Sequence, residues 1–293
     1  MNPRSASFDP LTAEPMVGLH VSAAGSPDMA FDRAGELGAN TFQIFTRNPN
    51  QWKFKPLEDD VVKLFREKRK ESGFRKIVDH MPYLPNLASP EKSTMKISRY
   101  TLTEETKRCD ALGVDYLVVH LGSHLGKGSA VGMANIAGAV NGTLAESEGD
   151  TVILLENMAG QKNCVGARFE EIRGILDRVK KPGRVGVCLD SCHMFAAGFD
   201  LRNEEAVRGT MGLFEEIVGM DRLKVVHLND SKGPVGSRLD RHENIGEGRI
   251  GRAGMKAFLH YPGIDERPLI METPYEDIRT MEKSIKLVRT LMG

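Results

Sequence analysis

The sequence alternates eight times between a short apolar run and a longer amphipathic segment. Each run has the length of a strand and is rich in Val, Ile and Leu, which is typical of parallel strands buried on both faces. The runs start at Val17, Thr41, Lys76, Tyr116, Thr151, Val185, Lys224 and Pro268. Eight strand-then-helix units predict an α/β fold, a single (β/α)₈ TIM barrel, because a doubly wound sheet usually has about five to seven strands.

The length of 293 residues suits one such barrel, and no Gly/Ser-rich or Pro-rich linker divides the chain. We therefore expect an N-terminal extension at residues 1–16 and one catalytic barrel domain at residues 17–293. The extension lacks the apolar segment of a secretory signal, and no apolar run approaches the roughly 18 residues of a membrane helix. The four cysteines are too few for a disulfide framework, so we expect a cytoplasmic protein with reduced thiols.

Ionisable residues gather near the C-terminal ends of the predicted strands, where a barrel builds its active site. Six of the eight runs carry one, namely His80, His120, Glu156, Asp190, His227 and Glu272. A single histidine at a strand end is more often a structural residue than a ligand. Burying several ions together, however, costs several kcal/mol each unless they are compensated. Divalent metal ions are the simplest compensation for a mixture of His, Asp and Glu.

Two pairs of residues extend this pattern. Asp190 and His193 flank the point where a strand gives way to a loop, and they could serve two adjacent metal ions. Asp240 and His242 form a D-x-H triplet, and alternate residues of an extended segment share a face, so both can bind one ion. Alone, such a triplet is more often part of a solvated loop. Beside the six strand ends it favours a metal site.

A glycine pattern close to this triplet does not indicate a nucleotide site. Residues 246–251 read GEGRIG and match G-x-G-x-x-G, but that fingerprint requires a preceding buried strand. The preceding residues, DRHEN, do not form one. We interpret the glycines as a tight bend beside Asp240 and His242.

Seven segments together resemble the endonuclease IV family, the zinc-dependent apurinic/apyrimidinic endonucleases of DNA base-excision repair. They extend from about Val17 to about Pro274 and read HVSAAGS, LVVHLGSHL, LLENMAGQ, CLDSCHMFAAGFD, HLNDSK, SRLDRHENIGEGRIG and LIMETP. The resemblance implies a (β/α)₈ barrel, in agreement with the independent count of strands.

The resemblance also implies three Zn²⁺ ions, and the chain has a matching residue at every ligand position. The sets are His80, His120 and Glu156 for the first ion; Glu156, Asp190, His227 and Glu272 for the second; His193, Asp240 and His242 for the third. Glu156, Glu272 and His120 are the expected catalytic residues of the set. Mn²⁺ and Fe²⁺ are possible substitutes in such mixed nitrogen and oxygen sites. Three divalent ions outweigh four carboxylates, so the loaded site suits a phosphodiester that gains negative charge in its transition state.

The implied reaction is hydrolysis of the phosphodiester 5′ to an abasic site in duplex DNA, leaving a 3′-hydroxyl and a 5′-deoxyribose phosphate. The expected partner is damaged duplex DNA that contains abasic sites or blocked 3′ ends, bound by a monomer without membrane attachment. An abasic nucleotide has no base to unstack, so it is extruded more readily than an intact one.

Three residues correspond to positions at which the family fills the vacated space in the duplex. Tyr83 and Leu84 match two of them, although the pair is also compatible with ordinary loop packing. The third position is an arginine in the family and Asn50 here. Arg47, Gln51 and Trp52 of the same segment are candidates to replace it.

Two alternatives remain open from the sequence. A metal-dependent sugar isomerase or epimerase on the same barrel also uses Glu, Asp and His at strand ends. Such enzymes usually need fewer metal ions, so His193, Asp240 and His242 argue against that reading. A DNA-damage binding protein or metal-storage scaffold without turnover would not require the complete ligand set.

Overall fold

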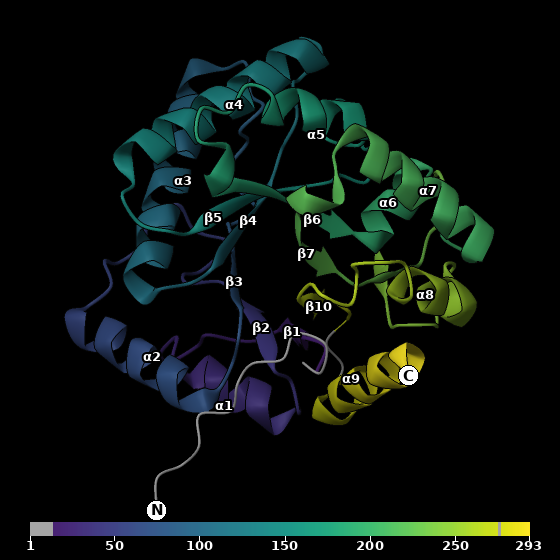
Figure 1. Cartoon of the computed structure of the whole chain (residues 1–293). Helices are drawn as coiled ribbons and strands as arrows, with labels where there is room; N and C mark the ends of the chain where they lie inside the picture. The colour runs from purple at the N-terminus through teal and green to yellow at the C-terminus, as the bar shows by residue number, and fades with distance from the viewer. Residues whose placement is uncertain (1–13, 275–276) are drawn as a thin grey trace, which may run out of the picture.

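A computed structural model of the protein describes residues 14–274 and 277–293. Most of the predicted N-terminal extension, residues 1–13 of 1–16, lies outside this part of the chain. Eight parallel strands close into a barrel in the order β1-β10-β7-β6-β5-β4-β3-β2 (Figure 1). The predicted (β/α)₈ barrel is therefore confirmed.

Every predicted apolar run coincides with one barrel strand, with β7 beginning one residue before its run. The strands are β1 Val17–His20, β2 Thr41–Ile44, β3 Ile77–His80, β4 Tyr116–His120, β5 Val152–Glu156, β6 Val185–Asp190, β7 Leu223–His227 and β10 Leu269–Met271. Two further short strands, which the sequence did not predict, pair antiparallel outside the barrel. They are β8 Asp230–Ser231 and β9 His242–Glu243.

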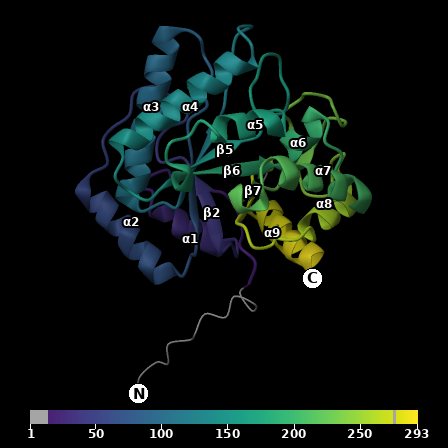
Figure 2. The same ribbon diagram turned by 45° about the horizontal axis from the view of Figure 1, so that its top comes forward.

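Helices surround the barrel on its outside (Figure 2). They are α1 Met29–Glu36, α2 Asp59–Ser72, α3 Lys92–Leu112, α4 Ser129–Glu146, α5 Phe169–Leu176, α6 Ser191–Ala197, α7 Glu204–Ile217, α8 Gly251–Leu259 and α9 Ile278–Met292. Short 3₁₀ turns at Pro182–Arg184 and Met220–Arg222 precede β6 and β7. Helix α9 packs against β1 and α8 and so completes the ring. Among the described helices, none is both long and apolar enough to cross a membrane.

The interior of the barrel is filled by a small apolar cluster. It consists of one fully buried residue from each of six strands, namely Val78, Val118, Leu154, Cys188, Val225 and Ile270. A larger apolar core lies between the outer faces of the strands and the helices. Successive residues of a strand alternate between these two sides. The residue two positions after each member of the interior cluster therefore faces the barrel axis one layer nearer to the C-terminal ends.

Candidate metal centre

The layer above the apolar cluster contains the six ionisable residues predicted at the strand ends. Each follows its interior neighbour by two positions, as His80 follows Val78 and Glu156 follows Leu154. His80, Glu156, Asp190 and His227 are almost completely buried. The strand alternation thus brings together side chains that are far apart in the sequence, at the end of the barrel where the helices begin.

The first cluster that could hold a metal ion consists of His80, His120 and Glu156. Oε2 of Glu156 lies 3.2 Å from Nε2 of His80 and 3.0 Å from Nε2 of His120. Nδ1 of His80 donates to the backbone carbonyl of Met81 at 2.7 Å, which leaves Nε2 as the atom directed at Glu156.

The second cluster shares Glu156 with the first and adds Asp190, His227 and Glu272. Nδ1 of His227 lies 2.9 Å from Oε1 of Glu156 and 3.3 Å from Oε2 of Glu272. Glu156 therefore presents one carboxylate oxygen to each cluster.

The third cluster brings His193 and His242 together with two carboxylates. Oδ1 of Asp240 lies 3.2 Å from Nε2 of His193 and 3.4 Å from Nε2 of His242. Asp190 lies 3.5 Å from Nε2 of His242 and forms a compact group with both histidines. Asp190 thus stands between the second and third clusters.

The two histidines of the third cluster suit a metal ion better than a hydrogen bond. Their Nε2 atoms are buried and make no hydrogen bond within the described residues, although carboxylate oxygens are near. Their Nδ1 atoms are occupied, since His193 donates to the Asn157 carbonyl at 2.9 Å and His242 to the Glu272 carbonyl at 3.0 Å. Fixing one ring nitrogen in this way orients the other toward a metal ion.

The ionisable groups of the third cluster shift one another's pKa values. Burial alone lowers the pKa of His193, but the carboxylates of Asp190 and Asp240 outweigh burial and raise the pKa to about 10. Burial alone raises the pKa of Asp240, but His193 and His242 outweigh it and lower the pKa to about 2. Without metal, the protonated His193 offsets part of the negative charge of the two carboxylates. A bound cation would take over this role and displace the protons.

The predicted DNA-contacting residues lie on loops at the same end of the barrel. Tyr83 and Leu84, between β3 and α3, are exposed. The ring of Tyr83 also packs 5.5 Å from the ring of His80 and 5.6 Å from that of His120, measured between centroids. Asn50 is exposed in the loop between β2 and α2.

Two of the candidates to replace the family arginine differ sharply in their surroundings. The guanidinium of Arg47 is buried, and its Nε donates to the carboxylate of Glu105 at 2.6 Å. Arg47 is therefore held inside the protein by Glu105 and does not point toward a ligand at the surface. Trp52 is 38% exposed in the same loop and is free to meet a ligand.

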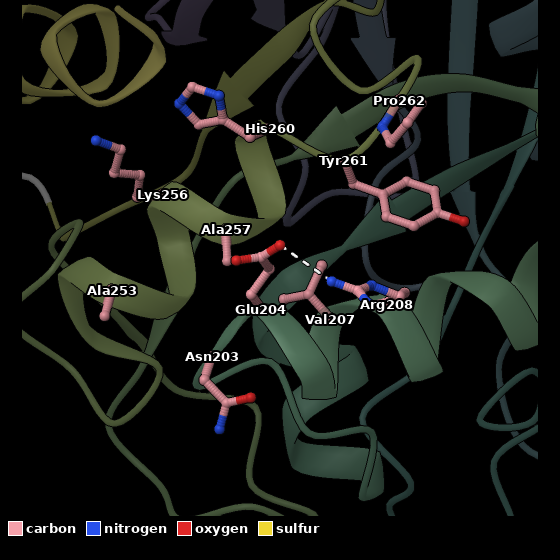
Figure 3. A pocket seen from close by; sticks show the side chains of 10 residues that line it. All are labelled: Asn203, Glu204, Val207, Arg208, Ala253, Lys256, Ala257, His260, Tyr261 and Pro262. Atoms are coloured by element: carbon pink, nitrogen blue, oxygen red, sulfur yellow. Dashed lines mark hydrogen bonds and ion pairs between the residues drawn. The ribbon is translucent and has the colours of Figure 1, made fainter.

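Several hollows lie on the surface of the described residues, and three of them can be compared with the position of the metal centre. One of about 230 Å³ adjoins the clusters and is lined by Tyr83, His20 and Glu272 together with residues of α9. Another of about 930 Å³ lies between residues 21–27 and the loop that carries Lys53 and Lys55. The third, of about 750 Å³, lies on the outside between α7 and α8 (Figure 3). Its lining contains none of the predicted ligands, so it is separate from the metal centre.

Three buried amide side chains around the clusters were not predicted from the sequence. Asn229 donates to Oδ2 of Asp190 at 2.7 Å, and Asn157 accepts from the backbone nitrogen of Asp190 at 2.6 Å. Gln43 bonds to His227 and Glu272. A signal for them exists, because each is an uncharged polar residue inside or directly after a predicted buried strand.

The GEGRIG segment wraps around a carboxylate of its own chain. The buried Asp230 accepts hydrogen bonds from the backbone nitrogens of Gly246, Gly248, Ile250 and Gly251. These donors are directed at Asp230, as expected for a bend rather than a nucleotide site.

Residues 31–291 match the family model described as a xylose isomerase-like TIM barrel. A protein of Methanoculleus marisnigri named probable endonuclease 4 is 46% identical over 279 residues, which are 95% of this chain and 99% of that protein. The chain belongs to the endonuclease IV family. The crystal structure of endonuclease IV from Thermus thermophilus superposes with a TM-score of 0.85 at 34% identity, covering 95% of this chain and 99% of that one.

The family extends to a eukaryotic relative of the chain. The apurinic-apyrimidinic endonuclease of Caenorhabditis elegans is 41% identical over 262 residues, which are 88% of this chain and 66% of the worm protein. This endonuclease IV family member therefore shares most of its length with about two-thirds of the worm protein.

Proposed function

We propose that the protein hydrolyses the phosphodiester bond 5′ to an abasic site in duplex DNA, leaving a 3′-hydroxyl and a 5′-deoxyribose phosphate. Removal of blocking groups from 3′ ends would be a second reaction of the same site. The observation that carries the proposal is the convergence of nine His, Asp and Glu side chains in three adjoining clusters. The names and structures of the relatives support the substrate.

The nine side chains provide nitrogen and oxygen ligands suited to three zinc ions. Bound zinc supplies Lewis-acid stabilisation of phosphoryl oxygens and activates water near neutral pH. Glu156 joins the first two clusters and so fixes their separation, while His120 and Glu272 complete them on the more accessible side. His193, Asp240 and His242 would hold the third ion, which would supply positive charge to stabilise the leaving oxygen.

The DNA would lie across the strand ends. Tyr83 and Leu84 project beside the first cluster, and Lys53 and Lys55 are exposed on the neighbouring loop. Lysine side chains there suit the phosphate backbone, which supplies most of the sequence-independent affinity for DNA. The hollow beside Tyr83 and Glu272 offers a place for a sugar without a base. We propose that one monomer engages one duplex.

The family model alone does not exclude a sugar isomerase, because its description covers barrels of that kind. The third cluster separates the two functions. Isomerisation by proton transfer needs a base and rarely a third metal position, whereas phosphodiester cleavage gains from a cation beside the leaving oxygen. A purely DNA-binding role would not account for three clusters of buried charged residues.

The decisive experiment is multiple-turnover cleavage of a duplex with one synthetic abasic site, with the undamaged duplex as control. The proposal predicts a nick 5′ to the site, a 3′-hydroxyl end that a polymerase extends, and loss of turnover after chelation. A second duplex with a 3′-phosphoglycolate end tests the cleaning reaction. Binding without turnover, or isomerisation of a ketose without cleavage, would contradict the assignment.

A further inference from the structure

The inward-facing layer that holds the metal ligands has two more members, and neither belongs to the predicted ligand set. Five barrel strands contribute His80, His120, Glu156, Asp190 and His227 to this layer, and Glu272 joins it directly after β10. The remaining strands, β1 and β2, contribute His20 and Gln43. Gln43 is completely buried, and its neighbours Phe42 and Ile44 face the helices instead. A buried amide in this layer must find partners among the ligands.

Gln43 makes three contacts, and together they define the orientation of its amide. Oε1 accepts a hydrogen bond from Nε2 of His227 at 2.8 Å. Nε2 of Gln43 donates to Oε1 of Glu272 at 2.6 Å and to Nδ1 of His20 at 3.0 Å. A carboxylate accepts only, so the nitrogen of the amide must face Glu272 and the oxygen must face His227.

This contact decides which nitrogen of His227 is available. Nε2 of His227 shares its proton with Gln43, so when a metal ion displaces the proton between Nδ1 and Oε1 of Glu156, Nδ1 is the nitrogen left to bind the ion. His80, His193 and His242 do the opposite, since each donates Nδ1–H to a backbone carbonyl and presents Nε2. The proton of His227 is thus held by a side chain, whereas a backbone carbonyl holds the ring proton in each of the three other histidines.

The same amide also orients a carboxylate. The bond to Gln43 occupies Oε1 of Glu272, and Oε2 lies on the side of the second cluster, 3.3 Å from Nδ1 of His227. One side chain therefore sets the direction of two ligands that belong to a single cluster.

We propose that Gln43 is a positioning residue of the second metal cluster, which selects Nδ1 of His227 and directs Oε2 of Glu272 toward the ion. The inference rests on the zinc centre proposed above. Partners of this kind typically change metal affinity or activity by about 10- to 100-fold.

Two variants and one control test this assignment on the full-length protein. Gln43→Met keeps the length of the side chain but removes all three hydrogen bonds of the amide. Gln43→Glu keeps an acceptor for His227 but loses the donor to Glu272 and His20. The control is Thr41→Val, which lies two residues earlier on the same face of β2 and removes only a bond from Thr41 to the backbone carbonyl of Lys76.

Three measurements are made on each protein. Competition with a chromogenic chelator gives the zinc affinities. ¹⁵N–¹H spectra of protein labelled at histidine identify the protonated ring nitrogen of His227 in the zinc-loaded state. Thermal melts with and without zinc give the increment in Tm that zinc adds, which separates a metal-positioning role from a general loss of stability.

We expect Gln43→Met to bind one zinc ion about 10- to 100-fold more weakly, to gain less Tm from zinc, and to lose the single Nε2–H signal of His227. Gln43→Glu should retain that signal, and Thr41→Val should match the wild type in all three measurements. If Gln43→Met does not fold, Gln43→Glu still tests the inference. Loss of the His227 Nε2–H signal in zinc-loaded Gln43→Glu would overturn it.

The outcomes separate this inference from the proposed function. A wild-type protein that binds no zinc overturns both. A wild-type protein that loads zinc, together with a Gln43→Met variant of equal affinity and unchanged His227 signal, leaves the zinc centre intact and shows that Gln43 only fills space.

Discussion

The carboxylate of Asp230 lies directly against the backbone of Gly248, whose nitrogen donates to Oδ2 at 3.1 Å. A Cβ at position 248 would lie 2.5 Å from Oδ1 of Asp230 and 2.6 Å from the carbonyl oxygen of Ser231. Only glycine therefore permits this approach. Since β8, which contains Asp230, pairs with β9, which contains His242, the same contact supports the third metal cluster.

Gly248→Ala should accordingly destabilise the protein by about 1–3 kcal/mol, because it separates buried backbone donors from their acceptor. It should also lower the zinc content, since His242 loses its support. Gly212→Ala is the matched control, because it lies within α7 with open space around it and should be neutral or slightly stabilising. Thermal melts and metal analysis of both variants check this. Equal stability of the two variants would show that the loop relaxes without cost.

Zinc binding should release protons at neutral pH. The carboxylates around His193 hold its pKa at about 10 in the metal-free protein despite burial, so this histidine is protonated at pH 7. A metal ion must displace that proton, and zinc affinity should therefore fall as the pH is lowered. Titration calorimetry in buffers of different ionisation enthalpy measures the number of protons released. A binding enthalpy independent of the buffer would contradict the charge state inferred for the cluster.

Asp240 and His242 should act as a unit. Oδ1 of Asp240 lies near Nε2 of both His193 and His242, so these three side chains would bind the same ion. Substitution of Asp240 or of His242 by alanine would therefore remove one ligand of that ion. Each single variant should lose a similar share of cleavage activity, and the double variant should be little worse, because losses within a unit are not additive. Rates on the abasic duplex at saturating zinc check this. Losses that multiply in the double variant would assign the two residues to different ions.

The gathering of six ionisable side chains at the strand ends could be predicted because these residues obey the alternation of a buried strand. His80 follows Val78, and Glu272 follows Ile270, at the spacing that keeps both on one face. Gln43 obeys the same spacing but was missed, since a neutral amide in an apolar run gives no sign of its partners. Those partners, His227 and Glu272, are more than 180 residues away and meet it only when the barrel closes. The hydrogen bonds from the backbone of residues 246–251 to Asp230 could not be predicted either. They depend on the direction of the backbone N–H groups, which the GEGRIG pattern does not determine.

Trp52, rather than Arg47, should contribute to DNA binding from the loop that carries Asn50. Trp52→Ala removes an exposed ring and should weaken binding of abasic duplex while leaving Tm and zinc content unchanged. Arg47→Ala instead leaves the buried carboxylate of Glu105 without this partner, and breaking such a pair costs about 3–5 kcal/mol. Binding titrations and thermal melts of the two variants test whether Trp52 contacts DNA and Arg47 stabilises the fold. A Trp52→Ala variant with wild-type affinity would assign DNA contact to other residues.

Tyr83 should separate DNA engagement from chemistry at the metal centre. Its ring is 53% exposed beside the first cluster, and stacking contacts with nucleic acid are worth about 1–3 kcal/mol per base. Tyr83→Ala should therefore slow cleavage of abasic duplex by roughly 5- to 150-fold. Hydrolysis of a small chromogenic phosphodiester should stay near the wild-type rate, because that substrate needs the metal ions alone. Glu156→Ala should abolish both reactions, since it removes the ligand shared by two clusters.

The packing of Tyr83 on His80 and His120 calls for a control that retains the ring. Tyr83→Phe keeps this packing, and Leu84→Ala, at the next position, shortens an exposed side chain. Both should load zinc as the wild type does, and Leu84→Ala should impair the duplex reaction selectively. If Tyr83→Ala loses zinc and both activities together while Tyr83→Phe loses neither, the ring supports the histidines, and its assignment to DNA contact is wrong.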